Sequence, residues 1–290
     1  LVLLAIHVLR TEGLWVLLKK IRRRINVVAY RPHKPKLIPM SEPFGPLTLP
    51  KPGDGPRVSV IIPTRGGITY THYCLVALCK CEDKTTFEVI VIDDEPIGET
   101  AVRLGNYVNL RLIRNEENLG FVLSCNRGAA IAKGDYLIFL NNDTQVQSGW
   151  LDALIWTFEH QPNAGLVGSR LIYPDGRQQE AGGIVFKDGS AWNYGHLDDP
   201  YRPEYSYLRE PDYVSGAALA IPRNLFLKVG GFNPNYAPGY YEDTDLAFRL
   251  REAGYHIYYQ PCSRVLHFEG VSAGRDESSP MGMKQFQVVN

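Results

Sequence analysis

The feature that most constrains the fold of this chain is the alternation of apolar runs with helix-forming segments between residues 57 and 160. Runs rich in Val, Ile and Leu predict strands buried on both faces, at residues 58–62, 87–93, 108–113 and 135–140. Helices are expected at residues 70–82, 120–133 and 149–160. Such β-α units join parallel strands through right-handed crossovers, so the sequence predicts an α/β fold with a mostly parallel, doubly wound sheet.

Polar residues follow three of the predicted strands at the point where each one ends. These residues are Pro63-Thr64-Arg65, Asp93-Asp94-Glu95 and Asn141-Asn142-Asp143. In parallel α/β sheets, ligands bind beyond the carboxyl ends of the strands. One acidic strand end is common because Asp favours turns, whereas carboxylates at neighbouring strand ends indicate a ligand site.

The residue types at these strand ends suit a nucleoside diphosphate. Carboxylates and amides can bind base and ribose, and a divalent cation can offset the charge of a leaving diphosphate. Mg²⁺ and Mn²⁺ prefer oxygen ligands and bind through one or two carboxylates plus the phosphates, so Asp143 is the candidate metal ligand. The chain has no Gly-x-x-x-x-Gly-Lys-Ser/Thr loop, and Gly66-Gly67 is not part of a Gly-x-Gly-x-x-Gly motif, which disfavours P-loop NTPases and dinucleotide enzymes.

The second half of the chain contributes another set of candidate residues. It predicts a strand with small side chains at 212–221, a short helix at 223–230 and a late strand at 255–260. Glu242 and Asp243 open an amphipathic helix, where acids fit helix capping and function equally well. His267 follows at the end of an apolar stretch, and a lone histidine is more often structural than a ligand.

A series of motifs in the same order resembles glycosyltransferase family 2 over roughly residues 57–275. The strings VSVIIPT, VIDDE and NLGFVLSCNRGAAIAKGDYLIFLNND are similar to the donor-binding half of that family. The strings VSGAALAIPRNLFLKVGGF, YYEDTDLAFRLREAGYHIYYQP and VLHFEG are similar to its acceptor half. The resemblance implies a GT-A fold, in which a Rossmann-like sheet merges with a smaller mixed sheet. It divides the domain, 57–290, into a nucleotide-sugar-binding half at 57–145 and an acceptor half at 146–275.

The resemblance also implies a role for each residue at a motif position. The nucleotide-sugar pocket would be lined by Pro63, Thr64, Arg65, Asp93, Asp94, Asn118, Gly120 and Asn142. Asp143 would hold Mn²⁺ or Mg²⁺ at the diphosphate, and His267 would complete the metal shell. Asn141 departs from a strict Asp-x-Asp motif, because it stands where the first carboxylate would be and lowers the charge of the metal site.

Asp243 matches the position of the family's catalytic base. An alcohol is a poor nucleophile, and a carboxylate within hydrogen-bond reach can accept its proton during attack. A single in-line displacement of the diphosphate would invert the anomeric configuration. Glu242 is expected to orient Asp243 or to bind acceptor hydroxyls. Tyr240, Tyr241 and Trp192 are candidates for stacking on acceptor sugars, although buried packing explains any one of them equally well.

The implied function is inverting transfer from a UDP-, dTDP- or GDP-sugar to a hydroxyl of a glycan or lipid-linked glycan. The resemblance is to rhamnosyltransferase-like members and suggests surface-polysaccharide synthesis, for example of O-antigen. Two alternatives stay open. A degenerate domain that binds glycans or scaffolds a complex would not need Asp143, Asp243 and His267 together. A sugar nucleotidyltransferase would need a Gly-rich loop before an Arg, whereas here the glycines follow Arg65.

The first 56 residues differ in composition from the rest. Residues 1–36 hold nine of the 31 Lys and Arg against one acid, Glu12, so this segment carries +8 and the remainder −8. An acidic body argues against a nucleic-acid-binding surface. Residues 1–28 predict a basic amphipathic helix, compatible with an anionic membrane surface or with packing on another domain of a longer polypeptide. Eight prolines within 31–56 predict an extended linker, so the compact domain is expected from Arg57.

The cysteines and the opening apolar run bear on the compartment. Five cysteines form an odd number without framework spacing, which favours a reducing, cytoplasmic compartment. The first nine residues are apolar, a run too short to span a bilayer and without the features of a signal peptide. We therefore expect a cytoplasmic protein, with peripheral attachment to the inner face of the membrane through residues 1–36 as an option.

Overall fold

The computed structural model describes residues 35–41, 44–53 and 55–270. The chain divides into two compact units, Leu1–Lys34 and Pro35–Asn290, and the sheet belongs to the second. The basic helix predicted at residues 1–28 lies outside the described residues. The same holds for most of the segment expected to contact a membrane or another domain.

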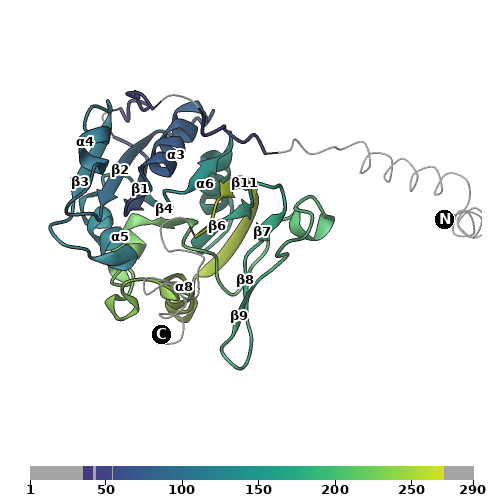
Figure 1. The fold of residues 1–290 in the computed structure, drawn as a ribbon. Helices are drawn as coiled ribbons and strands as arrows, with labels where there is room; N and C mark the ends of the chain where they lie inside the picture. The colour runs from purple at the N-terminus through teal and green to yellow at the C-terminus, as the bar shows by residue number, and fades with distance from the viewer. Residues whose placement is uncertain (1–34, 42–43, 54, 271–290) are drawn as a thin grey trace, which may run out of the picture. The chain divides into compact units, whose positions relative to one another are not determined.

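The second unit is built on a mixed sheet that contains nine strands within the described residues (Figure 1). Four parallel strands lie side by side in the order β3 (Leu110–Arg114), β2 (Phe87–Asp93), β1 (Val58–Thr64) and β4 (Tyr136–Leu140). The order continues through β10 (Ala218–Pro222), β6 (Ala164–Ile172), β11 (His256–His267) and β5 (Thr144–Val146), while β7 (Gln178–Glu180) pairs with β6. β10 is antiparallel to β4 and β6, which makes it the boundary between the parallel strands and the mixed part.

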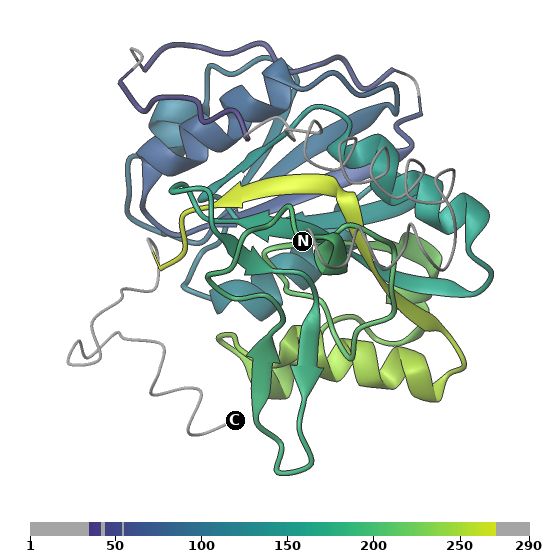
Figure 2. The same cartoon turned by 90° about the vertical axis from the view of Figure 1, so that its right-hand side faces the viewer.

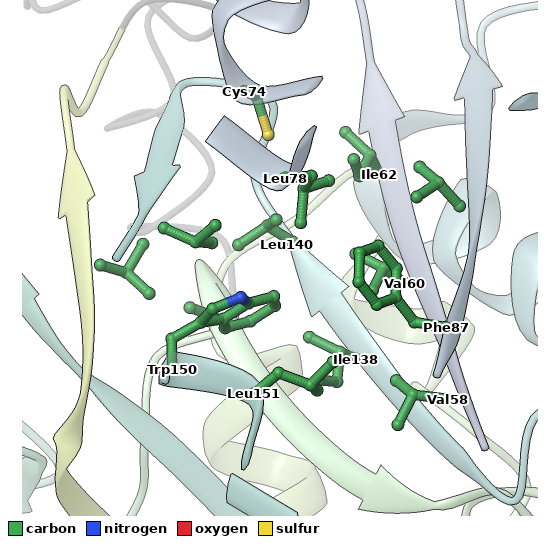
Figure 3. Packing of buried hydrophobic residues seen from close by; sticks show 14 of the residues in the cluster. Val58, Val60, Ile62, Cys74, Leu78, Phe87, Ile138, Leu140, Trp150 and Leu151 are labelled. Atoms are coloured by element: carbon green, nitrogen blue, oxygen red, sulfur yellow. The ribbon is translucent and has the colours of Figure 1, made fainter. Parts of the chain in front are cut away.

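Helices cover both faces of this sheet because its central strands are apolar on both sides (Figure 2). On one face, α3 (Ile68–Lys80) and α6 (Trp150–His160) pack against the strands, and Figure 3 shows Trp150 and Leu78 beside Leu140 in this cluster. On the other face, α5 (Gly120–Ile131), α7 (Arg223–Lys228) and α8 (Glu242–Glu252) contribute to a second cluster. The short α4 (Thr100–Leu104) precedes β3. Both clusters anchor the strand ends that carry the polar motifs.

The predicted elements of the first half agree with the structure to within a few residues. The differences lie in the second half. The strand predicted at 212–221 is confined to Ala218–Pro222, because Tyr213 forms an isolated bridge to Gly183 and residues 216–217 form a turn. Residues 256–267 form one long strand, β11, with a register shift between Gln260 and Arg264. β11 pairs with β5 so that His267 lies opposite Thr144, directly after Asp143.

The proline-rich segment packs on the domain where the sequence predicts a linker. Residues 35–41 and 44–53 belong to the second unit, which begins 22 residues before Arg57. Leu49 is buried, and its amide donates to the carbonyl of Val108 at 3.1 Å. At the other end, the Ile38 amide donates to Gln145 at 2.8 Å. The local sequence gives no sign of this burial, because Leu49 and its partner Val108 are far apart in the sequence.

Other connections complete the second half. β8 (Gly183–Val185) and β9 (Ala191–Asn193) form a separate hairpin that projects from the sheet (Figure 1). Two 3₁₀ turns, η1 (Pro203–Tyr205) and η2 (Pro234–Tyr236), precede β10 and α8 respectively. Of the helices in the described residues, none combines the length and apolarity required to cross a bilayer. All five cysteines are described and each is a free thiol.

Candidate active site

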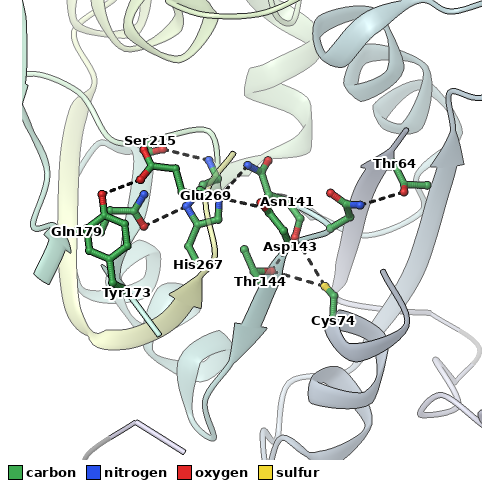
Figure 4. Close-up of polar contacts among 12 residues, drawn as sticks. Thr64, Cys74, Asn141, Asp143, Thr144, Tyr173, Gln179, Ser215, His267 and Glu269 are labelled. Atoms are coloured by element: carbon green, nitrogen blue, oxygen red, sulfur yellow. Dashed lines mark hydrogen bonds and ion pairs between the residues drawn. The ribbon is translucent and has the colours of Figure 1, made fainter. Parts of the chain in front are cut away.

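The end of β4 and the end of β11 bring three polar side chains together (Figure 4). Asn141 and Asp143 directly follow β4, and His267 is the last residue of β11. Asp143 and His267 are both buried. Backbone bonds fix this arrangement, since the Phe268 amide donates to the Asp143 carbonyl at 3.0 Å. The sheet register therefore joins two residues that are 124 positions apart in the sequence.

The distances in this cluster suit a shared divalent cation. His267 Nε2 lies 3.2 Å from Asp143 Oδ1 and 3.3 Å from Asn141 Nδ2. Two ligands at right angles on an octahedral ion, each about 2.1 Å from it, are about 3 Å apart. Among the described residues there is no cluster of three or more His, Cys, Asp or Glu side chains that could hold a metal. The protein would thus supply Asp143 and His267, leaving other positions for diphosphate and water.

Asp243 lies in the first turn of α8 and is bound to a neighbouring loop as well as to its own helix. Its Oδ2 accepts from the Gly216 amide at 2.8 Å, and its Oδ1 accepts from the Thr244 amide at 2.7 Å. Burial raises the pKa of this carboxyl above its ordinary value, and the three hydrogen bonds from Gly216 and Thr244 oppose that shift. Helix capping alone does not explain the residue, because one oxygen is turned toward the loop before β10.

Two further carboxyl groups lie next to Asp243. Burial, followed by the charge of Asp243, raises the pKa of Glu242 to about 8, and one oxygen of Glu242 has no hydrogen-bond partner. Glu180, at the end of β7, is 2% exposed and accepts from the Ser215 amide at 3.0 Å. Burial also raises the pKa of Glu180 to about 8, with the charge of Asp243 adding to the effect. The site therefore favours neutral forms of these acids.

The backbone that presents these acids is strained. Tyr240 and Tyr241, directly before Glu242, have φ angles of 76° and 66°. Left-handed conformations are rare for bulky residues and are found most often where the surrounding structure enforces them, as at functional sites. Both tyrosines are half-buried. Their role in acceptor binding stays a prediction, as does that of Trp192, which is 56% exposed on the projecting hairpin.

The acidic end of β2 is occupied by internal contacts. Asp93 is fully buried and forms an ion pair with Arg114 at 3.0 Å. Asp94 is also buried, and its two oxygens accept from the amides of Leu119 and Gly120, each at 2.8 Å. Asp94 thus caps the start of α5. The nucleotide contacts predicted for this pair would have to coexist with these bonds.

A similar internal network joins the ends of β1 and β4. The Asn142 amide donates to the hydroxyls of Thr64 and Thr71 at 3.1 and 3.0 Å. Pro63 is buried, whereas Arg65 is exposed. The buried residues of this network hold the strand ends together, and Arg65 faces solvent beside them.

The remaining predicted nucleotide contacts lie at the start of α5. Asn118 is exposed, and its Oδ1 accepts from the Gly120 amide at 3.2 Å. The structure places Asn118 and Gly120 at the same sheet edge as Asp94, as the strand order requires. Their contacts with a nucleotide stay predictions.

Sequence reasoning missed Glu180 and its neighbour Gln179. Both are buried, and Gln179 Oε1 lies 3.0 Å from His267 Nδ1 (Figure 4). Residues 178–180 are all polar, and only the pairing of β7 with β6 reveals that they are buried. No local signal in the sequence identifies them.

Comparison with known proteins agrees with the fold and with the motifs. The model of the family described as Glycosyl transferase family 2 matches residues 59–220. The chain is 32% identical over 227 residues to the N-acetylglucosaminyl-diphospho-decaprenol L-rhamnosyltransferase of Mycobacterium tuberculosis, covering 71% of this chain and 74% of that protein. It is 28% identical to the O-antigen biosynthesis protein RfbC of Myxococcus xanthus, covering 76% of this chain but only 18% of that protein.

Solved structures show the same fold at low sequence identity. The structure of GalNAc-T7 with UDP, GalNAc and Mn²⁺ matches with a TM-score of 0.64 and 19% identity, over 81% of this chain and 48% of that one. The mannosyltransferase PcManGT from Pyrobaculum calidifontis, solved with GDP-Man and Mn²⁺, matches with a TM-score of 0.53 and 18% identity, over 82% of this chain and 62% of that one. The predicted α/β, GT-A type fold is thereby confirmed. The chain belongs to glycosyltransferase family 2 and is a glycosyltransferase of the GT-A fold.

Proposed function

We propose that this chain transfers a sugar, with inversion, from a nucleoside-diphosphate sugar to an acceptor hydroxyl, and that Asp243 is the general base. One observation carries the proposal. The Gly216 amide donates to Asp243, and the carbonyl of the next residue, Ala217, accepts from the Asn141 amide at 2.9 Å. A single peptide segment thus ties the proposed base to the strand end that bears Asp143. This is the juxtaposition needed when a diphosphate leaves on one side and a hydroxyl attacks on the other.

Asp143 and His267 are the residues that would hold the divalent cation. A bound Mn²⁺ or Mg²⁺ would stabilise the negative charge that develops on the leaving diphosphate. The carboxylate of Asp143 and the neutral imidazole of His267 are both suitable ligands for Mn²⁺. Mn²⁺ is present in the structures of GalNAc-T7 and PcManGT, which supports this choice.

Asp243 would accept the proton of the acceptor hydroxyl as the new glycosidic bond forms. Two backbone amides and the Thr244 hydroxyl hold its oxygens, so the carboxylate is oriented before the acceptor binds. Its raised pKa makes it a better proton acceptor than an exposed Asp. Glu242, buried next to it, is placed to orient Asp243 or to bind acceptor hydroxyls.

The donor is a UDP-, dTDP- or GDP-sugar, and the acceptor is a glycan or lipid-linked glycan. The rhamnosyltransferase and RfbC relatives support surface-polysaccharide synthesis as the setting. The donor sugar can be identified by mass-spectrometric screening of nucleotide sugars for binding, followed by turnover of the binders.

The base is tested by the Asp243→Asn variant. With the donor and acceptor found in that screen, we expect the turnover number to fall by about 10²–10⁴-fold, since the variant lacks a proton acceptor, while donor affinity is unchanged. The matched control is Asp245→Asn in the same turn of α8, where Asp245 pairs with Arg249 at 2.7 Å. Wild-type turnover by Asp243→Asn, measured by nucleotide release, would exclude Asp243 as the base.

The metal site is tested by calorimetry with the donor nucleotide in the presence and absence of Mn²⁺. We expect Mn²⁺ to strengthen donor binding by the wild-type protein and to have no effect on the Asp143→Ala variant, which loses the carboxylate ligand. Asp188→Asn, at an exposed loop, is the control and should retain the Mn²⁺ effect. Equal donor affinity of the wild-type protein with and without Mn²⁺ or Mg²⁺ would contradict the metal role.

A further inference from the structure

Gln179 is a buried side chain at the active site for which the proposed reaction has no role. It lies in β7, which pairs with β6 at residues Leu171 and Ile172. Its side chain is 3% exposed. Its Oε1 lies 3.0 Å from His267 Nδ1, on the opposite side of the imidazole ring from Asp143. Figure 4 shows the ring between Gln179 on one side and Asn141 and Asp143 on the other.

This contact favours a hydrogen on the Nδ1 nitrogen of His267. A neutral imidazole has one N–H, and a carbonyl oxygen can only accept a hydrogen bond. With the Gln179 oxygen facing it, Nδ1 must be the donor. Nε2 then keeps a lone pair, and that lone pair faces Asp143 Oδ1 at 3.2 Å.

The second contact of Nε2 points to the same tautomer. The Asn141 amide nitrogen, a donor, lies 3.3 Å from Nε2 and requires a lone pair there. Asn141 can therefore donate to His267 from a position where a strict Asp-x-Asp motif has a carboxylate. The Asn141 amide thus opposes the Asp143 carboxylate, which on its own would favour a hydrogen on Nε2.

A lone pair and a carboxylate oxygen that face each other repel unless a cation lies between them. In this tautomer the pair formed by His267 and Asp143 is unfavourable when empty and favourable around a divalent ion. In the other tautomer, Nε2–H would donate to Asp143 and occupy the space that the ion needs. The position of one hydrogen therefore decides whether the two side chains bind each other or bind a metal.

We propose that Gln179 is a positioning residue that holds His267 as its Nδ1–H tautomer and so presents Nε2 to the divalent cation. The inference rests on the proposed metal role of Asp143 and His267, and it adds a residue outside the ligand set. Residues that orient metal-binding histidines in this way typically contribute about 10–100-fold to metal affinity.

The test is the Mn²⁺ affinity of the protein and its dependence on Gln179. Affinity is measured by calorimetry with Mn²⁺ in the presence of UDP, GDP and dTDP in turn. In Gln179→Leu, which offers no acceptor to Nδ1, we expect an Mn²⁺ affinity weaker than that of the wild-type protein by about 10–100-fold.

Two other variants separate positioning from packing. Gln179→Glu keeps an acceptor at Nδ1 and should retain Mn²⁺ affinity. Gln260→Leu removes another buried glutamine, which lies on the same strand as His267 and donates to Thr157 at 2.8 Å. That variant should lose stability without loss of Mn²⁺ affinity. An equal loss in Gln260→Leu would assign the effect to packing and overturn the inference.

The outcomes distinguish this inference from the metal proposal on which it rests. If Mn²⁺ does not affect nucleotide binding by the wild-type protein, the metal proposal fails. If Mn²⁺ binds but Gln179→Leu keeps the wild-type affinity, the inference alone is wrong. Should Gln179→Leu not fold, Gln179→Glu still decides, because a loss of Mn²⁺ affinity in that variant would overturn the inference.

Discussion

Three acids, Glu180, Glu242 and Asp243, surround the short loop formed by Ser215 and Gly216. Glu180 and Asp243 each accept from one amide of this loop, and a Cβ on Gly216 would lie 3.4 Å from a Glu242 oxygen. Burying several carboxylates together is costly, so such groups retain protons at pH values where exposed acids are charged. This arrangement has a consequence for stability as well as for catalysis.

The stability of the domain should depend on the ionisation of Glu180. An unfolded chain loses the Glu proton above its ordinary pKa of about 4.5, whereas the folded protein keeps it up to about pH 8. Between these values the folded state binds more protons, so this group makes stability fall as pH rises, by at most about 1.4 kcal/mol per pH unit. The Glu180→Gln variant has no proton to lose there and should fall less steeply between pH 5 and 8.

Urea unfolding of the two proteins at pH 5, 6.5 and 8 measures this difference. Gln keeps an oxygen that can accept from the Ser215 amide, so the two proteins differ in the ability to ionise and not in this hydrogen bond. Glu252→Gln at an exposed position is the control and should follow the wild-type curve. Parallel pH dependences for wild type and Glu180→Gln would show that Glu180 is ionised in the folded protein throughout this range.

The sequence identifies candidate site residues best where a motif ends a strand. The motifs single out Asp143 and His267 as partners, and the structure brings them within 3.2 Å. Gln179 and Glu180 could not be found, because their burial depends on pairing of β7 with β6 and not on any local pattern. At Asp94 the sequence pattern fits two different roles. A polar residue at a strand end can contact a ligand, but Asp94 also accepts from the first amides of α5, and the sequence does not distinguish ligand binding from helix capping.

At the scale of elements, the start of α5 connects the two halves of the site. Asp94 accepts from the first amides of the helix, while the Pro238 carbonyl accepts from the Phe121 amide at 2.7 Å. Pro238 lies in the segment that leads through the strained tyrosines to Glu242 and Asp243. The helix N-terminus therefore holds the loop that positions the proposed base. The close approach requires Gly120, because a Cβ there would lie 2.7 Å from the Pro238 Cα.

A comparison of Gly120→Ala with Gly149→Ala separates the cost of a positive φ angle from the cost of a steric clash with Pro238. Both glycines precede or begin a helix with positive φ, 75° and 80°, but a Cβ on Gly149 would meet nothing within 4 Å. Gly149→Ala should lose only the conformational cost of about 1 kcal/mol, and Gly120→Ala about 1–3 kcal/mol more. We also expect turnover to fall in Gly120→Ala alone, because the Pro238 loop must move. If Gly120→Ala and Gly149→Ala lose the same free energy of unfolding and the same turnover, the proposed link between Gly120, the Pro238 loop and the base is wrong.

The elements that sequence patterns predict best are those that bury both faces. β1 and β2 are buried throughout, and continuous apolar runs identify them directly. The sequence places β10 and β11 less well because their boundaries depend on pairing partners. The turn at 216–217 interrupts an apolar stretch, and the shift at Gln260 lets β11 continue past a polar segment.

At the scale of the whole unit, the proline-rich segment contacts both ends of the sheet. Residues Lys36 and Ile38 bond to side chains of Gln147 and Gln145 next to and within β5. Further on, Leu49 pairs with Val108 beside β3. β5 and β3 are the terminal strands of the sheet order. The extended segment therefore lies against both terminal strands, and a covered edge is less prone to pair with other chains.

This contact predicts that the domain begins at residue 35 and not at residue 57. A chain shortened to start at Arg57 should unfold at lower urea concentration than one that starts at Pro35, since it loses a buried leucine and both edge contacts. Leu49→Ala in the full chain should cost about 2–5 kcal/mol, because Leu49 is 1% exposed.

Leu37→Ala in the same segment is the matched control. At 43% exposure, Leu37 should contribute within about 0.5 kcal/mol of zero. If the two shortened chains have the same stability, and Leu49→Ala costs no more free energy of unfolding than Leu37→Ala, the proline-rich segment is a linker. The domain then begins at Arg57, as the sequence predicts.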